Sequence, residues 1–121
     1  MKKSAKKWDS GSTVDENDVA RFDALADRWW DPQGPMAPLH RLNPPRLSYI
    51  REKLCAHFGL DPEARTPFKG LRVADIGCGG GILSEPLARL GAKVTGVDAA
   101  AQNIHVAAAH AAARGLDIED R

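Results

Sequence analysis

A glycine-rich turn directly behind an apolar run is the feature that most limits how this chain can fold. The run from Leu71 to Ala74 leads into Asp75-Ile76-Gly77-Cys78-Gly79-Gly80-Gly81, and residues 82–90 then form an amphipathic segment. A second apolar run, at residues 93–97, ends at Asp98, seventeen residues after Gly81. Strand, glycine turn, helix, strand and acid follow one another in the order of a βαβ unit. The sequence therefore predicts an α/β fold with a nucleotide-like cofactor on the glycine turn.

Composition and charge indicate a single ordinary globular domain. The chain has 121 residues, of which 43% are hydrophobic and 27% charged, and 17 basic side chains balance 16 acidic ones. This length suits one small domain, and so balanced a charge gives no general attraction for nucleic acid, which is not expected as a partner. The sequence contains no apolar stretch of about 18 residues and no signal-peptide region, so a cytoplasmic location is expected. Cys55 and Cys78 lack metal-ligand spacing, and no metal site is expected.

Three segments are expected along the chain. Residues 1–13, which contain four lysines, are interpreted as a flexible basic tail. Residues 14–60 are expected to form two helices that act as a lid on the substrate side. Residues 61–121 are expected to be the first half of a Rossmann-like cofactor-binding domain. Because open sheets of this kind have roughly five or more strands and only two are expected here, the chain is interpreted as part of a longer protein.

The first predicted helix follows Asp15, a suitable cap, and ends at Asp31-Pro32, because proline does not continue a helix. Trp29 extends the apolar face of this helix, and core packing is favoured both for Trp29 and for Trp30. The second helix is predicted to run from Pro44 to about Phe58, with a capping Asn43 ahead of it.

The later elements are read from short apolar runs and their breakers. Residues 71–76 are apolar almost throughout, which predicts a strand covered on both faces. In the helix that follows, Pro86 leaves the starting residue open. A second strand is predicted at Lys93–Val97 and an alanine-rich helix at Gln102–Arg114. Residues 116–121 are compatible with the start of a third strand.

Three cofactors are candidates for the glycine turn. A dinucleotide fingerprint needs a small residue where Ile82 stands, so a nicotinamide cofactor is the weaker alternative. A Walker loop needs a lysine that the sequence lacks at this point. The pattern is D-x-G-x-G-x-G, and the Asp75 carboxylate is better suited to a ligand with an ammonium and a sulfonium than to a pyrophosphate. S-adenosylmethionine is such a ligand, and Asp98 can accept hydrogen bonds from its ribose hydroxyls.

The glycine turn resembles motif I of the class I S-adenosylmethionine-dependent methyltransferases. Three longer stretches are similar to a narrower family, the ubiquinone biosynthesis O-methyltransferases: F-D-A-L-A-D-R-W-W-D at residues 22–31, P-L-H-R-L-N-P-P-R-L-S-Y-I at 38–50 and D-I-G-C-G-G-G-I-L-S-E at 75–85. The resemblance covers about residues 14–115. It implies the amino-terminal half of a Rossmann-like class I methyltransferase fold, truncated after the second strand-helix unit and preceded by two helices.

The resemblance also implies a reaction and a set of contacts. The reaction is methylation of phenolic hydroxyls on polyprenylated quinone precursors, with a polyprenylated phenol or catechol as substrate. Contact with the inner membrane surface or with a ubiquinone-biosynthesis complex would come from the missing half, and the 121 residues alone are expected to be inactive. Arg46, which follows Asn-Pro in the family, would pair with the methionine carboxylate. The expected cofactor-binding residues are Arg46, Asp75, Gly77, Cys78, Gly79, Gly81 and Asp98.

Methyl transfer to a phenol requires alignment of the two reactants and a group that takes the phenolic proton. Of the four histidines, His57, His105 and His110 fall in predicted helices and are expected at the surface or between helices. His40 lies in the proline-rich segment ahead of Arg46 and is a weak candidate for the catalytic base. The sequence leaves the base, the acceptor site and any metal requirement open.

Overall fold

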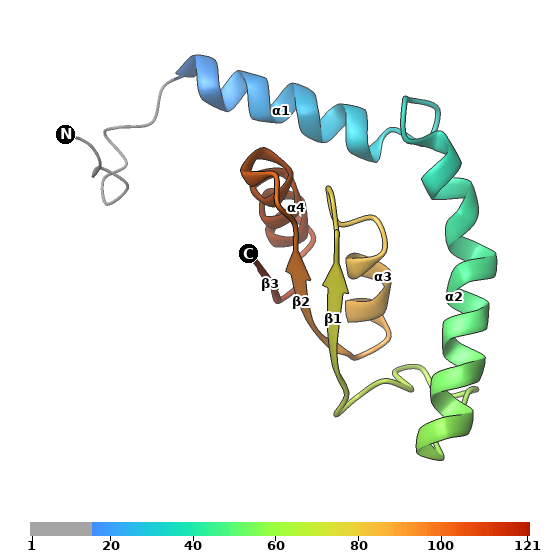
Figure 1. The fold of residues 1–121 in the computed structure, drawn as a ribbon. Helices are drawn as coiled ribbons and strands as arrows, with labels where there is room; N and C mark the ends of the chain where they lie inside the picture. Colours follow the sequence, from blue (N-terminus) through green and yellow to red (C-terminus); the bar gives the residue numbers. More distant parts are fainter. Residues whose placement is uncertain (1–15) are drawn as a thin grey trace.

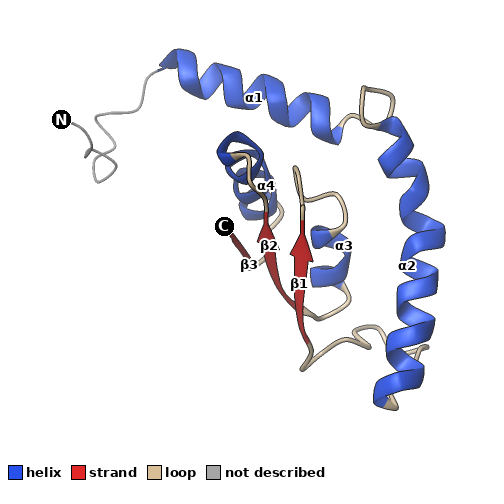
Figure 2. Cartoon of the chain, in the orientation of Figure 1, coloured by secondary structure: helices blue, strands red, loops and turns tan. Residues whose placement is uncertain are grey.

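The computed structural model describes residues 16–121, so the expected tail at residues 1–13 lies outside the described range. Within that range four helices and three strands alternate as in a class I methyltransferase, with two helices ahead of the first strand (Figures 1 and 2). The elements are α1 Glu16–Trp30, α2 Ala37–Phe58, β1 Arg72–Ile76, α3 Ser84–Arg89, β2 Lys93–Val97, α4 Ala101–Ala113 and β3 Ile118–Asp120.

The three strands form one parallel sheet in the order β1-β2-β3. The register pairs Asp75 of β1 with Gly96 of β2, and Gly96 with Asp120 of β3. Residues 118–120 thus form the third strand with which residues 116–121 were compatible, in addition to the two expected strands. The short third strand forms because Ile118 packs against the core while its backbone pairs with Val94, which is buried.

The prediction that the first strand is covered on both faces is wrong. Successive side chains of a strand point to opposite faces. Val73 packs against the core that contains Leu87 of α3, whereas Ala74 is exposed and Ile76 is 75% exposed. The apolar run thus has one packed face and one face that the described residues leave open.

Helix α2 begins at Ala37, seven residues before the predicted start at Pro44. Pro38 falls in its first turn, where the missing amide hydrogen costs no helical bond, and Pro44 and Pro45 lie inside the helix. Asn43 does not cap the helix, because its side-chain amide donates instead to the carbonyl of Ile82, at 2.9 Å. Such a contact with the glycine turn helps to hold a helix whose interior prolines weaken it.

The remaining boundaries agree closely with the predictions. Helix α1 ends at Trp30, β2 spans Lys93–Val97 as predicted, and α4 begins and ends one residue early. Pro86 is the third residue of α3, within the first turn, so it removes no internal helical bond.

The core lies between α2, α3 and the sheet. Phe68, which is fully buried, packs with Cys55, Leu87, Ala92 and Val94. Cys55 therefore has a packing role in the core. The α2 side chains that join this cluster are Leu47, Ile50 and Leu54.

The carboxyl ends of β1 and β2 point toward α1, which crosses above them and packs against α4 (Figure 1). Helix α2 runs down the side of the molecule beyond α3. In open α/β sheets the ligand site lies at the carboxyl ends of the strands. The expected site therefore lies beneath α1. Among residues 16–121, no helix is both long and apolar enough to cross a bilayer.

Candidate functional site

The glycine turn leads from β1 to α3 and is hydrogen-bonded to the end of β2. Gly77 and Gly79 have φ angles of +76° and +57°, a region that other residues adopt only with strain. The backbone amides of Gly77 and Cys78 both donate to the carbonyl of Val97, at 2.6 and 2.9 Å. The turn is therefore held in place by the strand that carries Asp98 at its end.

The Asp98 carboxylate is bound to this turn. Its Oδ2 atom accepts a hydrogen bond from the amide of Gly79 at 2.9 Å, and its Oδ1 atom accepts one from the amide of Ala100 at 2.8 Å. The hydrogen bonds from Ala100 and Gly79 lower the pKa of Asp98, with a further contribution from Asn103. Asp98 is thus held as a carboxylate next to the bare backbone of the turn.

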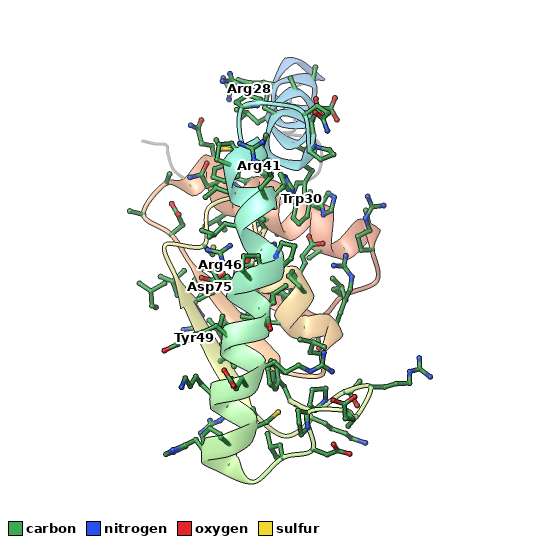
Figure 3. All side chains as sticks on the ribbon, turned by 90° about the vertical axis from the view of Figure 1, so that its right-hand side faces the viewer. Arg28, Trp30, Arg41, Arg46, Tyr49 and Asp75 are labelled. Carbon is green, nitrogen blue, oxygen red and sulfur yellow. The ribbon has the colours of Figure 1, made fainter. Side chains whose placement is uncertain are left out.

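A cavity of about 130 Å³ lies against the turn and brings together five of the seven predicted cofactor-binding residues. They are Arg46, Asp75, Gly77, Cys78 and Gly79. The remaining wall is formed by Trp29 and three aliphatic side chains, Leu39, Ile82 and Leu83. Arg46 and Asp75, which both line this cavity, are labelled next to each other in the view with α2 in front (Figure 3).

The two charged residues of the cavity have different partners. Asp75 accepts a hydrogen bond from the hydroxyl of Ser84 at 2.7 Å. The Nη2 atom of Arg46 donates to Asn43, but its Nε atom is buried and has no partner among the described residues. A buried donor without a partner is uncommon and points to a missing acceptor.

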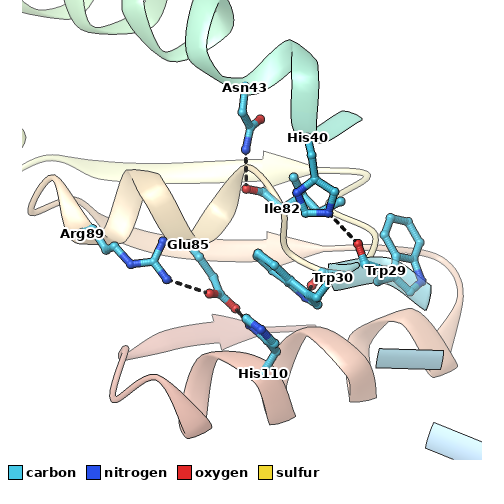
Figure 4. A network of polar contacts seen from close by, with 9 residues as sticks. Trp29, Trp30, His40, Asn43, Ile82, Glu85, Arg89 and His110 are labelled. Atoms are coloured by element: carbon cyan, nitrogen blue, oxygen red, sulfur yellow. Dashed lines mark hydrogen bonds and ion pairs between the residues drawn. The ribbon is translucent and has the colours of Figure 1, made fainter. Parts of the chain in front are cut away.

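Three predicted residues do not line the cavity: Asp98, which is hydrogen-bonded to the turn, Gly81 and His40. Gly81 does not line the cavity, and a Cβ atom at this position would lie 3.5 Å from the Cβ of Ala107 in α4. His40 is not a cavity residue either, because its Nε2 atom is 2.8 Å from the carbonyl oxygen of Trp29 (Figure 4). Gly81 faces α4 with room for a Cβ atom, and its φ of +92° is what favours glycine there. The position of His40 indicates a link between α1 and α2.

The tryptophan pair lies at the site rather than in the core, which corrects the expected core packing. Trp29 is half-buried, and its indole lies on Gly79 and Gly80. Trp30 donates from Nε1 to the carbonyl of Gly80 at 3.0 Å and stacks on His110 with ring centroids 3.8 Å apart. His110 is therefore an interhelical residue, as predicted. Core packing of the two tryptophans was expected because the sequence marks only an apolar helix face, which packs equally well on bare backbone and on core side chains.

Sequence reasoning assigned no site role to Asn43, Ser84 or Trp29. Asn43 was interpreted as a helix cap, and Trp29 as an extension of an apolar stripe. A signal for Ser84 exists, because a small polar residue stands three positions after Gly81, where the next helix begins near the strand end. Asn43 and Trp29 carry no comparable local signal.

A row of acidic residues crosses the sheet beside the turn. The register places Asp75 and Asp120 on either side of Gly96, and Cys78 Sγ would lie 3.0 Å from a Cβ atom on Gly96. Burial raises the pKa of Asp120 to about 6, and the neighbouring Glu85 and Asp75 carboxylates add to the effect. Burial also raises the pKa of Cys78 to about 11, reinforced by Asp120, so this thiol stays protonated.

The replacement Asp120→Asn should stabilise the protein near neutral pH. The folded protein favours the protonated form of Asp120, because the pKa of this residue is raised to about 6. The resulting stabilisation is complete below the unfolded-state pKa of about 3.9 and is lost as pH rises through about 6. We expect a gain of about 1 kcal/mol near pH 7, after allowing for solvent screening, and none near pH 4. Urea unfolding of the unmodified protein and the variant at the two pH values measures this gain in unfolding free energy. An equal gain at both pH values would contradict the raised pKa of Asp120.

A larger hollow, of about 560 Å³, lies between α2 and the loop that follows it. Its lining includes Arg51, Glu52 and Cys55 but none of the glycine-turn residues. The smaller cavity is therefore the candidate site, because it combines bare backbone with two of the predicted charged residues, Arg46 and Asp75.

Comparisons with known proteins agree with the fold. Residues 73–120 match the family described as "Methyltransferase domain". Proteins named "Ubiquinone biosynthesis O-methyltransferase" from Parvibaculum lavamentivorans and from Chelativorans sp. (strain BNC1) are 59% and 57% identical over 110 residues. These alignments cover 91% of this chain and 44% of each relative, so the chain spans less than half the length of the curated relatives it matches.

Among solved structures, the bifunctional kinase-methyltransferase WbdD is similar, with a TM-score of 0.53 and 26% identity over 76% of this chain and 18% of WbdD. A second structure of WbdD gives the same TM-score and identity. Residues 73–120 therefore match the methyltransferase domain family, and over 91% of its length the chain is similar to proteins named ubiquinone biosynthesis O-methyltransferase.

Proposed function

We propose that the protein to which this chain belongs is an S-adenosylmethionine-dependent O-methyltransferase of ubiquinone biosynthesis. One observation carries the proposal: the small cavity joins Arg46, Asp75 and the bare backbone of Gly77 and Gly79, and Asp98 is bound to the same turn. The names of the relatives support the reaction class.

The residues of the cavity fit the chemical groups of this cofactor. The buried Nε of Arg46 would donate to the methionine carboxylate, which would supply its missing acceptor. Asp75, which faces the same cavity, would attract the ammonium. Asp98 already accepts two backbone hydrogen bonds and a long one, at 3.4 Å, from Asn103. A carboxylate has about four lone-pair sites, so one is free for a ribose hydroxyl, and exchange of the Asn103 contact would provide the second.

Bound S-adenosylmethionine supplies a methyl group on a positively charged sulfur. The task of the described residues is then to fix the cofactor so that its methyl group faces the acceptor in line with the attacking oxygen. We propose a phenolic hydroxyl on a polyprenylated ring as the acceptor, in keeping with the names of the relatives. Such a substrate is dissolved in a membrane, so we also propose a cytoplasmic protein that contacts the inner membrane or a ubiquinone-biosynthesis complex through residues outside this chain.

Attack by a phenolic hydroxyl also requires a group that accepts its proton. His40 is the candidate among the described residues, and with Nε2 directed at the carbonyl of Trp29 the proton would have to be taken by Nδ1. His40 does not line the cavity, so it would act only after α1 and α2 had moved. We accordingly expect the 121 residues by themselves to have no turnover.

Equilibrium binding to the full-length protein tests the cofactor class. We expect retention of S-adenosylhomocysteine with a dissociation constant in the micromolar range or below, and at least about 100-fold weaker binding of NAD, because Ile82 and Asp75 disfavour a pyrophosphate. Isothermal titration with each ligand measures the two affinities. Preferential binding of NAD would contradict the proposal and support the oxidoreductase alternative.

A further inference from the structure

We propose that Trp29 is a plug of the cofactor site: its indole occupies the glycine turn in the closed state and must leave before the cofactor binds. This inference rests on the proposed function, because it takes the glycine turn to be the cofactor site. It assigns to α1 a gating role in addition to that of a passive cover.

The contact between Trp29 and the turn is close. A Cβ atom on Gly79 would lie 2.5 Å from the indole Cη2 atom, and one on Gly80 would lie 2.6 Å from Cγ. The ring therefore covers two consecutive residues of bare backbone. Gly80 is informative because its φ angle is not positive, so its conformation does not require glycine. What requires glycine at Gly80 is the group lying on it, and here that group is Trp29.

The cavity that remains is too small for the cofactor. Sites for small molecules and cofactors usually enclose about 300–1,000 Å³, whereas the space beside Trp29 is about 130 Å³. Arg46, Asp75 and Trp29 line the same space, so a ligand that contacts both charges also meets the indole. The closed arrangement and a bound cofactor thus exclude one another.

The end of α1 is held by contacts that can be released together. Trp30 donates to Gly80 and stacks on His110, and the carbonyl of Trp29 meets His40. Among the α1 side chains that the structure describes, none is fully buried. The turns at residues 31–36 separate α1 from α2 and provide a hinge. Elements with little buried surface open at low free-energy cost.

A closed state that excludes the cofactor lowers its apparent affinity. If the open state is about 10% populated, the apparent dissociation constant is about tenfold weaker than that of the open form. The replacement Trp29→Ala should therefore tighten binding of S-adenosylhomocysteine by about tenfold, and Trp29→Phe, with a smaller ring, by less. Titration calorimetry on the full-length protein and both variants measures the change.

A second measurement needs no cofactor. Cys78 lines the cavity beneath Trp29, whereas Cys55 is buried in the core, and these are the two cysteines of the chain. We expect Trp29→Ala to raise the rate at which N-ethylmaleimide modifies Cys78 by about tenfold and to leave Cys55 unchanged. A faster reaction at both cysteines would mean general loosening and would contradict the plug.

The outcomes separate this inference from the proposed function. Tighter binding with selective exposure of Cys78 supports the plug. If the unmodified protein binds S-adenosylhomocysteine and Trp29→Ala binds it equally well or more weakly, the plug is contradicted but the proposed function is not. Trp29 would then be neutral for binding or a cofactor contact. Failure of all three proteins to bind S-adenosylhomocysteine contradicts the proposed cofactor, and the Cys78 rate alone then decides whether Trp29 closes the cavity.

Discussion

Replacement of Asp98 by alanine should weaken binding of S-adenosylhomocysteine by about 100-fold or more. A hydrogen bond to a charged group contributes about 1.5–3 kcal/mol, and the two ribose hydroxyls would both lose their acceptor. The same change frees the amides of Gly79 and Ala100, which now donate to this carboxylate at 2.9 and 2.8 Å. Titration of the full-length variant measures the loss.

Two further variants show whether the effect belongs to the ligand. Asp61 is an exposed turn aspartate whose Oδ1 accepts from the amide of Glu63 at 2.9 Å, so Asp61→Ala removes a similar local contact far from the cavity. We expect it to leave the affinity within about twofold, in line with a surface change. Asp98→Asn keeps the shape of the side chain and one acceptor oxygen, so its affinity for S-adenosylhomocysteine should fall between those of Asp61→Ala and Asp98→Ala. A loss of affinity equal in Asp61→Ala and Asp98→Ala would remove the ribose role of Asp98.

The central βαβ unit was predictable because its signals are local. Residues 93–97 form β2 at the predicted boundaries, and the glycine turn follows β1 directly. Apolar runs, glycines with positive φ and an acid at a strand end each report on a few neighbouring residues. Parallel strands then bring their carboxyl ends to one edge, so Asp75 and Asp98 flank the same turn.

The predictions that failed depend on contacts between distant parts of the chain. The start of α2 was placed at Pro44 because prolines are read as helix boundaries, but Asn43 and His40 attach this part of α2 to the glycine turn and α1. Helical periodicity marks Trp29 as facing inward, and it cannot reveal that the surface it meets is bare backbone fifty residues later. Side-chain partners across such separations require the folded structure.

Replacement of Glu85 by alanine should be the most destabilising of the predicted changes, at about 3–5 kcal/mol. Glu85 is fully buried and accepts hydrogen bonds from His110 at 2.6 Å and from Arg89 at 3.2 Å (Figure 4). The change removes the acceptor of both partners and leaves a cavity between α3 and α4. Urea unfolding of the full-length protein measures the loss of unfolding free energy.

Burial is what makes this expectation specific to Glu85. Glu52 is an exposed glutamate on α2, so Glu52→Ala makes the same chemical change in a solvated helix and should alter stability by less than about 0.5 kcal/mol. A double-mutant cycle with His110→Ala separates the Glu85–His110 interaction from the effect of the cavity that Glu85→Ala creates. The loss of stability in the double variant should be smaller than the sum of the two single losses by about 1 kcal/mol or more. If Glu85→Ala is no worse than Glu52→Ala, the interaction does not hold α3 to α4. Because His110 also supports Trp30, the same link then could not anchor the end of α1 over the glycine turn.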